Sequence, residues 1–361
     1  MIVYITSFTI LLSYYFFFFI RLFNYKKKQI SFSEPISVII CAKNEKDNLS
    51  KNLPRILSQK YINYEVIVVN DQSTDDTSFL LEDFERKYQN LVVVTIADHV
   101  NHKIGKKFAL TLGIKSAKHE YLLLTDADCC PASENWIKKM VENYSHSDII
   151  LGYGAYNKKP GVLNRFIRFD TFNVAQQYFS YALSGFPYMG VGRNLAYKKS
   201  LFFDNKGFAS HMHIASGDDD LFIQEVARKD NISIEIDSNA HTHSEVIDTW
   251  KQWIYQKRRH ITTSSIYLPK FKLLLSIYSF TQFLFWISLF LLFIFDTSIY
   301  LIISFLIIKL FVTYLINYRS MKKLNVLDLY WLHPLYEICY LLIQVNFVLL
   351  NLFSKPREWN K

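Results

Sequence analysis

The chain of 361 residues is half hydrophobic and carries a formal net charge of +9. Its lysines and arginines gather beside long apolar segments and around residues 251–259, which favours anionic lipid head groups over nucleic acid as the partner. The four cysteines form no CxxC pair and no disulfide framework, so we expect reduced thiols in a cytosolic domain.

The N-terminal segment is typical of a membrane helix. Residues 2–23 contain about twenty residues without charge before Arg21, enough to cross a bilayer core of roughly 30 Å. A secretory signal peptide is the alternative, but the positive charges follow the apolar run and no small-residue cleavage site is present. We therefore predict a transmembrane helix at residues 1–24.

Two further apolar segments, residues 273–295 and 298–317, are separated only by Asp296 and Thr297, which predicts a tight hairpin of two spanning helices. Residues 328–353 are long enough to span, but carry polar residues near their start and either cross fully or enter the interface. The membrane region is predicted at 273–353, with two or three helices.

Lysine and arginine positions predict the orientation in the membrane. Basic residues follow the first and third apolar segments, so the positive-inside rule places the large polar middle of the chain in the cytosol. If residues 328–353 span fully, the basic tail lies outside, against that rule. The basic residues are Lys26, Lys27, Lys28, Arg319, Lys322 and Lys323.

The middle of the chain alternates apolar runs with amphipathic stretches, which predicts a parallel α/β sheet buried on both faces. Ligands of such sheets bind beyond the carboxyl ends of the strands. Neither a GxGxxG nor a P-loop pattern follows the first strand, which excludes the usual dinucleotide and P-loop sites. The predicted strands are 36–42, 64–70, 91–97 and 120–127, and the predicted helices are 47–60, 75–89 and 106–117.

Polar residues follow each predicted strand. Two carboxylates one residue apart, Asp126 and Asp128, can share Mg²⁺ or Mn²⁺, with the remaining positions taken by water and a diphosphate. A basic loop with Lys103, Gly105 and Lys106 precedes a helix whose N-terminus could approach phosphate oxygens. A nucleotide held through a metal is therefore the predicted ligand.

The order of motifs over residues 35–262 resembles glycosyltransferase family 2, the inverting nucleotide-sugar transferases of the GT-A fold, in the membrane-bound branch of N-acetylglucosamine, cellulose and hyaluronan synthases. The resemblance implies an α/β fold, a GT-A doubly wound and mostly parallel sheet domain in the cytosol, flanked by transmembrane helices. "SVIICAKNE" resembles the first strand and its Asn-Glu exit against the nucleoside. "VVNDQSTDDT" resembles the Asp-Asp-x-Ser-x-Asp element, with Asn70 replacing the first aspartate. The implied nucleotide-sugar contacts are Ala42, Asn44, Glu45, Asp71, Lys106, Asp126, Gln256 and Arg259.

Four later motifs carry the implied chemistry. "DAD" matches the Asp-x-Asp metal motif at Asp126 and Asp128. "GVGRNLAYKKS" resembles the acceptor-side segment through Gly192 and Asn194. "SGDDDLFIQEVARK" implies Asp218 as the catalytic base, with Asp219 as the second candidate, although aspartates at a helix N-terminus also serve as caps.

"QKRRH" resembles the Gln-x-x-Arg-Trp motif of membrane synthases. His260, which we place on the acceptor side, replaces the tryptophan, and this puts long-chain processive synthesis in doubt. Arg258 and Arg259 can contact a diphosphate or anchor the chain at lipid head groups.

The resemblance implies a metal-assisted single displacement, in which the base takes a proton from an acceptor hydroxyl and that oxygen attacks the anomeric carbon with inversion. We expect a hexosyltransferase-class enzyme, multi-pass in the bacterial inner membrane with a cytosolic catalytic domain. Its partners would be a nucleotide-sugar donor, by family default UDP-linked, a lipid or glycan acceptor and membrane lipids, without nucleic acid. The alternatives are a processive polysaccharide synthase and a non-catalytic nucleotide-sugar-binding scaffold.

Overall fold

The computed structural model describes residues 1–27, 30–97, 105–214, 216–295 and 299–353. The chain divides into two compact units. Among the described residues, the sheet unit comprises Lys27–Asn157 and Pro187–Val246, and the helical unit comprises Met1–Lys26, Lys158–Phe186 and residues 247–353. The domain boundaries predicted from the sequence, 1–24, 35–262 and 273–353, stay a prediction.

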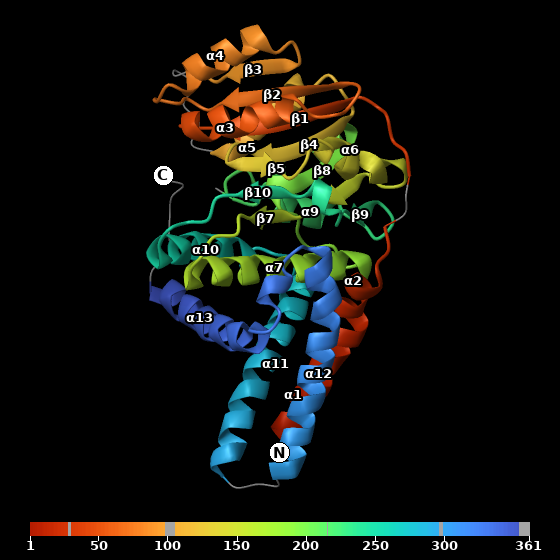
Figure 1. Cartoon of the computed structure of the whole chain (residues 1–361), viewed down its shortest axis with the longest axis vertical. Helices are drawn as coiled ribbons and strands as arrows, with labels where there is room; N and C mark the ends of the chain where they lie inside the picture. Colours follow the sequence, from red (N-terminus) through yellow and green to blue (C-terminus); the bar gives the residue numbers. More distant parts are fainter. Residues whose placement is uncertain (28–29, 98–104, 215, 296–298, 354–361) are drawn as a thin grey trace. The chain divides into compact units, whose positions relative to one another are not determined.

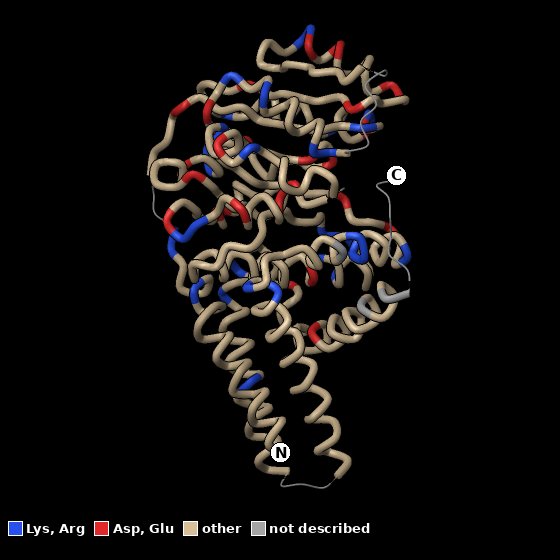
Figure 2. The backbone as a smooth tube through the Cα atoms, turned by 180° about the vertical axis from the view of Figure 1, so that it is seen from behind, with Lys and Arg blue, Asp and Glu red and all other residues tan. Residues whose placement is uncertain are grey.

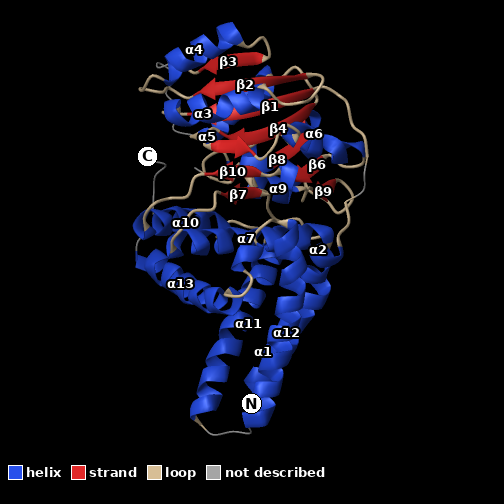
Figure 3. Cartoon of the chain, viewed as in Figure 1, coloured by secondary structure: helices blue, strands red, loops and turns tan. Residues whose placement is uncertain are grey.

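The sheet unit contains a mixed seven-stranded sheet in the order β3-β2-β1-β4-β8-β6-β9 (Figures 1 and 3). The first four strands along the chain are mutually parallel, whereas β8 is antiparallel to both β4 and β6. The α/β fold with mostly parallel strands is therefore confirmed. The strands are β1 Ile36–Ala42, β2 Tyr64–Asn70, β3 Leu91–Thr95, β4 Tyr121–Asp126, β6 Ile149–Leu151, β8 Leu195–Lys198 and β9 Ile232–Ile234.

A second, three-stranded sheet has the order β5-β10-β7. It consists of β5 (Cys129–Pro131), β10 (Thr242–Ser244) and β7 (Gly154–Tyr156). Because β5 begins three residues after Asp126, this small sheet fixes the chain immediately after the Asp-x-Asp motif. The sequence did not predict it, since three-residue strands carry no measurable periodicity.

Helices cover both faces of the large sheet, which explains why its central strands are apolar throughout. The helices α3 (Lys46–Leu57) and α6 (Trp136–Val141) pack on one face and form the main core with the sheet. On α5 (Lys106–Ser116), a Cβ at Gly113 would lie 2.8 Å from Ile39 and 2.9 Å from Val69, so only glycine allows this close approach. A further helix, α4 (Thr77–Lys87), connects β2 to β3.

The register of the central strands positions the site. Cys41 at the end of β1 lies opposite Asp126 at the end of β4. Because β8 runs antiparallel beyond β4, the parallel order of the sheet ends at β4. The carboxyl ends of β1 and β4 therefore form the edge at which a ligand is expected.

Within the part of the chain that the structure describes, four helices of the helical unit are long and apolar enough to cross a membrane, by length and composition. In Figure 1, α1, α11 and α12 run side by side, whereas α7 and α10 cross their direction, and Figure 2 shows few charges along most of the first three. Helices occupy the described parts of the predicted spans, namely Ile2–Asn24, Pro269–Ile294 and Ile299–Lys323. The helices are α1 Ile2–Tyr14, a π-helical turn Tyr15–Phe19, α2 Ile20–Asn24, α7 Val162–Leu183, α10 Trp250–Ser264, α11 Pro269–Ile294, α12 Ile299–Lys323 and α13 His333–Phe353.

Some sequence predictions fall outside the described residues, namely the turn at Asp296 and Thr297, the basic residue Lys28, the loop residue Lys103 and the basic tail. Lys323 is described and has a structural role. Its Nζ donates to the carbonyl oxygens of Leu22, Phe23 and Tyr25 at 2.5, 2.8 and 2.7 Å, and so caps the end of α2. This residue therefore supports the orientation less than its charge alone implies.

A buried ion pair joins α12 to α13. Lys309 Nζ donates to both carboxylate oxygens of Glu337, at 2.7 and 2.8 Å. Lys309 is 1% and Glu337 5% exposed. Ionisable side chains in an apolar helix are costly and are retained when they are paired.

We expect Glu337→Gln to destabilise the protein by about 3–5 kcal/mol, because it leaves the buried Lys309 charge without a countercharge. The midpoint of thermal unfolding in detergent measures this loss. Lys309→Met combined with Glu337→Gln removes both charges and is expected to recover most of the stability. A double variant as unstable as the single one would contradict the charge argument.

Candidate active site

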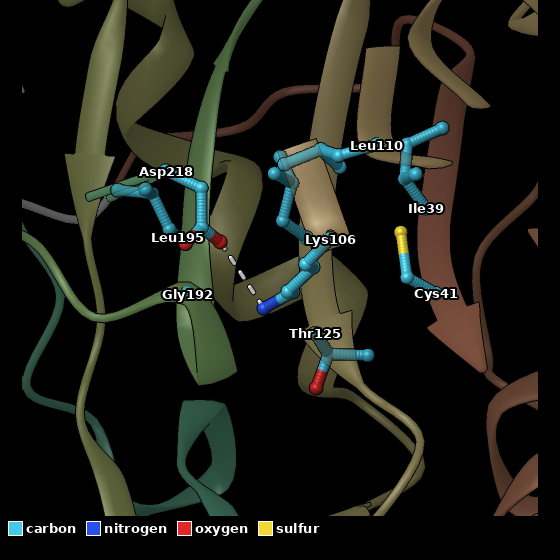
Figure 4. A pocket seen from close by; sticks show the side chains of 9 residues that line it. Ile39, Cys41, Lys106, Leu110, Thr125, Gly192, Leu195 and Asp218 are labelled. Atoms are coloured by element: carbon cyan, nitrogen blue, oxygen red, sulfur yellow. Dashed lines mark ion pairs between the residues drawn. The ribbon is translucent and has the colours of Figure 1, made fainter. Parts of the chain in front are cut away.

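Lys106 lies between two carboxylates at the carboxyl edge of the sheet. It is the first residue of α5 and follows Gly105, whose φ of 62° turns the chain into the helix. Its Nζ donates to Asp126 Oδ1 at 2.6 Å. The same Nζ lies 3.2 Å from Asp218 Oδ2, an ion pair marked in Figure 4. Burial alone would lower the pKa of Lys106, but Asp126 and Asp218 raise it well above the ordinary value. The lysine therefore stays charged and joins the two acidic motifs.

The three consecutive aspartates before and at the start of α9 (Asp220–Val226) have different environments. Asp219 accepts two backbone N–H groups, from Gly192 at 2.9 Å and Asp220 at 2.8 Å. Asp220 accepts the N–H of Leu221 at 2.8 Å. Asp218 instead faces Lys106 and lines a small cavity at this edge of the sheet. Asp218 is thus the member of the triplet placed to meet a ligand.

The charges around the triplet shift its pKa values in opposite directions. Burial raises the pKa of Asp218, but Lys106 outweighs burial and holds it below the usual range. Burial, Asp218 and Asp220 together raise the pKa of Asp219 to about 7. Asp218 is therefore ionised at neutral pH, and Asp219 holds a proton more readily.

Asp219→Asn is expected to remove a pH dependence of stability. Because the folded-state pKa of about 7 lies above the ordinary 3.8, protonated Asp219 stabilises the fold, and this contribution is lost as pH rises through 7. Asparagine resembles the protonated form. The unfolding midpoint of the variant should therefore rise relative to the native chain from about pH 5 to about pH 8. A constant difference across that range would contradict the raised pKa.

The cavity at this edge is small and mixed in polarity. Gly192 lies in its wall, where a Cβ would be at contact distance from both charged groups, 3.4 Å from Lys106 Nζ and 3.6 Å from Asp218 Oδ2. Cys41 also lines the cavity, but burial raises the pKa of its thiol to about 12, so it is no nucleophile at neutral pH. The lining residues are Ile39, Cys41, Lys106, Leu110, Leu124, Thr125, Gly192, Leu195 and Asp218.

The Asp-x-Asp motif fits a hard divalent cation. One potential ligand atom each from Asp126, Asp128 and Cys129 lies within 4.8 Å of the others. Carboxylate oxygens suit Mg²⁺ or Mn²⁺. Cys129 does not fit, because burial raises the pKa of its thiol well above the ordinary value and its Sγ lies 3.1 Å from Ser244 Oγ. The donor set is therefore the two aspartates.

Arg193 is a basic residue near the motif to which the sequence reading gave no role. Its guanidinium stacks 4.5 Å from the Tyr156 ring centre, and its carbonyl oxygen accepts a hydrogen bond from Thr125 Oγ1 at 2.9 Å. Burial alone would lower its pKa, but nearby groups, Asp126 and Asp128 among them, raise it. A lone arginine within "GVGRN" gave no signal that it would approach the carboxylates.

Hydrogen bonds join the segments that follow β1 and β2. Asp71 N–H donates to the Ala42 carbonyl at 2.8 Å, and Asn44 Oδ1 accepts the N–H of Thr74 at 2.7 Å. The Glu45 side chain accepts from Asn48 Nδ2 at 2.5 Å. The predicted donor-side residues therefore gather at one edge, where Asp71 is 6% exposed. Their contact with a nucleotide stays a prediction.

Asn194, predicted on the acceptor side, is fully buried. Its Nδ2 donates to the carbonyls of Tyr153 at 3.1 Å and Ala240 at 2.8 Å, and its Oδ1 accepts from Trp136 Nε1 at 3.1 Å. These bonds occupy both amide N–H groups, so its geometry favours a structural role. Of the predicted acceptor pair, only Gly192 lines the cavity.

Gln256, Arg259 and His260 lie on α10, in the helical unit. The approach of these three residues to the cavity of the sheet unit stays a prediction.

Lys107 anchors the segment that leads to the aspartates. Its buried Nζ contacts His211 Nδ1 at 2.6 Å and donates to the His211 carbonyl at 2.7 Å. His211 Nε2 in turn lies 3.7 Å from Glu225 on α9. Adjacent lysines on α5 thus serve two tasks, Lys106 in the cavity and Lys107 as a clamp on the acidic segment.

Lys107→Met is expected to lower kcat by about 10–100-fold, because small displacements of reacting groups have effects of that size. The KM for the nucleotide sugar should change little, since the Asp126 region is left intact. Lys115→Met on the exposed side of the same helix is the matched control. An unchanged kcat would contradict the clamp.

Comparison with known proteins identifies the domain. The model of glycosyl transferase family 2 matches residues 37–210. An uncharacterized glycosyltransferase of Haemophilus influenzae is 31% identical over 121 residues, covering 34% of this chain and 36% of that protein. The poly(ribitol-phosphate) beta-glucosyltransferase of Bacillus spizizenii is 29% identical over 210 residues, covering 56% and 31%. The poly-beta-1,6-N-acetyl-D-glucosamine synthase of Staphylococcus aureus is 29% identical over 155 residues, covering 42% and 35%.

A solved structure shares the fold over most of the chain. It is the mannosyltransferase PcManGT from Pyrobaculum calidifontis in complex with GDP-Man and Mn²⁺, with a TM-score of 0.59, 15% identity, and coverage of 92% of this chain and 96% of that chain. The present chain matches only about a third of the length of the curated relatives above, between 31% and 36%. The family match and the GT-A sheet agree, and residues 37–210 form a domain similar to glycosyl transferase family 2.

Proposed function

We propose that the protein is a membrane-anchored inverting glycosyltransferase, which transfers a sugar from a nucleotide sugar to a hydroxyl of a lipid- or glycan-type acceptor at the cytosolic membrane face. One observation carries the proposal. Lys106 contacts both Asp126 of the metal motif and Asp218, which lines the cavity, so one side chain joins the two acidic elements needed for the reaction.

The residues suit a single displacement. Asp218, ionised beside Lys106, accepts the proton of the acceptor hydroxyl. The resulting oxygen attacks the anomeric carbon as the bond to the diphosphate breaks, and the configuration inverts. A divalent cation held by Asp126 and Asp128 would neutralise charge on the leaving nucleoside diphosphate. The Lys106 side chain is long and flexible, so its ammonium group can contact the diphosphate. Arg193 adds a second positive group near the motif.

Donor recognition is proposed at the exits of β1 and β2. Ala42, Asn44, Glu45 and Asp71 are assigned to the nucleoside, and the expected donor is UDP-linked. Gln256 and Arg259 are assigned to the diphosphate and His260 to the acceptor. These assignments follow the motifs, and the gathering of the first four residues at one sheet edge supports them.

Membrane attachment is proposed through residues 1–24 and 273–353. The four apolar helices support it, and the protein is expected to be a multi-pass component of the bacterial inner membrane. The polar network around Glu337 favours α13 as a packed element of the membrane region, whether it crosses fully or enters the interface.

A screen of labelled nucleotide sugars tests the proposal. Full-length protein is incubated with each donor, Mn²⁺ or Mg²⁺ and a membrane lipid extract. A small lipid-soluble product supports single-sugar transfer to a lipid. A high-molecular-weight polymer as the main product would favour the processive synthase instead, and donor binding without any hydrolysis or transfer would favour the scaffold.

A further inference from the structure

The helical unit contains a cavity of its own, lined mainly by polar side chains. It lies among the π-helical turn of the first span, α7, α11 and α13. Amide, phenol, imidazole and carboxylate groups line it, although three of these elements belong to segments apolar enough to cross a membrane. The lining residues are Tyr15, Phe169, Asn173, Gln176, Tyr278, Gln282, His333, Glu337 and Tyr340.

The charge at this cavity is balanced. Glu337 is the only acidic lining residue, and Lys309 holds both of its carboxylate oxygens. Gln282 Nε2 and Trp286 Nε1 also donate to Glu337 Oε1, at 3.3 and 3.2 Å. Lys309 is thus already paired. A phosphate in the cavity would lie near the Glu337 carboxylate, and no Lys or Arg is among the lining residues. The cavity therefore disfavours anions.

A chain of hydrogen bonds ends in an unsatisfied group at the cavity. Gln176 Nε2 donates to Asn317 Oδ1 at 2.7 Å, and Asn317 Nδ2 donates to His333 Nε2 at 2.6 Å. A neutral imidazole that accepts at Nε2 carries its proton on Nδ1. Within the described residues His333 Nδ1 has no hydrogen-bond partner, lies 3.9 Å from Glu337 Oε2, and belongs to a side chain that is 5% exposed. A buried donor without a partner is costly, so an oxygen ligand is expected there.

We propose that this cavity binds the uncharged, hydroxyl-bearing head group of a membrane lipid, such as the free glycerol hydroxyl of a diacylglycerol. The lipid hydroxyl accepts a hydrogen bond from His333 Nδ1–H. It donates a hydrogen bond to a neighbouring oxygen, for example a carboxylate oxygen of Glu337. Tyrosines and amides provide further neutral partners, and the apolar helices suit acyl chains. The proposal names the class of acceptor lipid and in that respect rests on the proposed function.

Photoaffinity labelling tests this site without any sugar transfer. Full-length protein in nanodiscs is exposed to a photoreactive diacylglycerol or to a phosphatidic acid with the same chains, which differs only by the phosphate. Labelled peptides are mapped by mass spectrometry. We expect the diacylglycerol to label peptides of α11 and α13, about fivefold more than the phosphatidic acid, the size expected for one hydrogen bond gained.

Asn173→Leu replaces a lining amide with an apolar side chain of similar size and should reduce diacylglycerol labelling about fivefold. Tyr340→Phe, which removes one hydroxyl, guards against a folding defect in the first variant. Leu342→Ala, at a position 59% exposed on α13, is the control and should label like the native chain. Equal labelling by both probes, or no loss in both cavity variants, would overturn the proposal and leave a packing network with ordered water only.

The two proposals fail in distinguishable ways. Loss of labelling specificity with intact donor turnover removes the lipid site and leaves the glycosyltransferase. Specific labelling with no turnover of any nucleotide sugar removes the proposed activity and leaves the lipid site.

Discussion

Asp218→Asn is expected to lower kcat by about 10²–10⁴-fold, the range lost when a general base is removed. Asparagine has nearly the same shape but does not accept the proton of the acceptor hydroxyl. Lys106 keeps its contact with Asp126, so the donor side of the cavity should persist. The measurement is single-turnover transfer together with nucleotide-sugar binding by calorimetry, and binding should change less than threefold, by about 0.6 kcal/mol.

Asp219→Asn is the matched control for the base assignment. Its carboxylate accepts the N–H groups of Gly192 and Asp220, a capping task that the asparagine oxygen retains in part. We therefore expect stability close to that of the native chain at acidic pH and only a modest loss of kcat. If Asp219→Asn abolishes transfer while Asp218→Asn remains active, the base is Asp219, which was the second candidate.

The two strands whose bounds the sequence predicted without error are buried on both faces. The strands β1 and β2 coincide with the predicted 36–42 and 64–70, because such strands are continuous apolar runs. The predicted 91–97 and 120–127 extend one or two residues beyond β3 and β4. Strands such as β6 and β9 are only three residues long and are flanked by irregular segments. No periodic sequence pattern therefore indicated them.

The site divides in a similar way. Three site residues lie at the ends of elements: Asp126 ends a strand, Lys106 begins a helix, and Asp218 lies just before a helix. Their convergence at one edge is expected from the sheet topology. The separate tasks of Asp218 and Asp219 did not follow, because they depend on which carboxylate meets the Gly192 backbone, 27 residues distant in sequence. The Lys107 contact with His211 spans 104 residues and has no local signal. Long-range contacts of single side chains are therefore what the structure adds.

Asp126→Asn is expected to lower divalent-cation-dependent nucleotide binding by about 100-fold, and transfer by at least as much, because metal coordination contributes several kcal/mol to stabilising the diphosphate. The variant removes one of two hard oxygen ligands and also releases Lys106 from a 2.6 Å contact, so that Lys106 pairs with Asp218 alone. The measurement is calorimetric titration of UDP or GDP with and without Mn²⁺. Asp128→Asn, which leaves Lys106 in place, should reproduce the loss of cation dependence.

The matched control is Glu134→Gln, which removes a carboxylate whose side chain is 55% exposed and paired with Lys60 on the surface. Native binding in this control shows that the loss does not come from net charge. Comparison of the two aspartate variants then separates the roles at the motif. A defect in both that excess Mn²⁺ partly restores indicates ligation, whereas a defect confined to Asp126→Asn assigns the effect to Lys106. Cation-dependent binding that survives in both variants would refute the metal site, because the two carboxylates are the hard ligands that the motif offers.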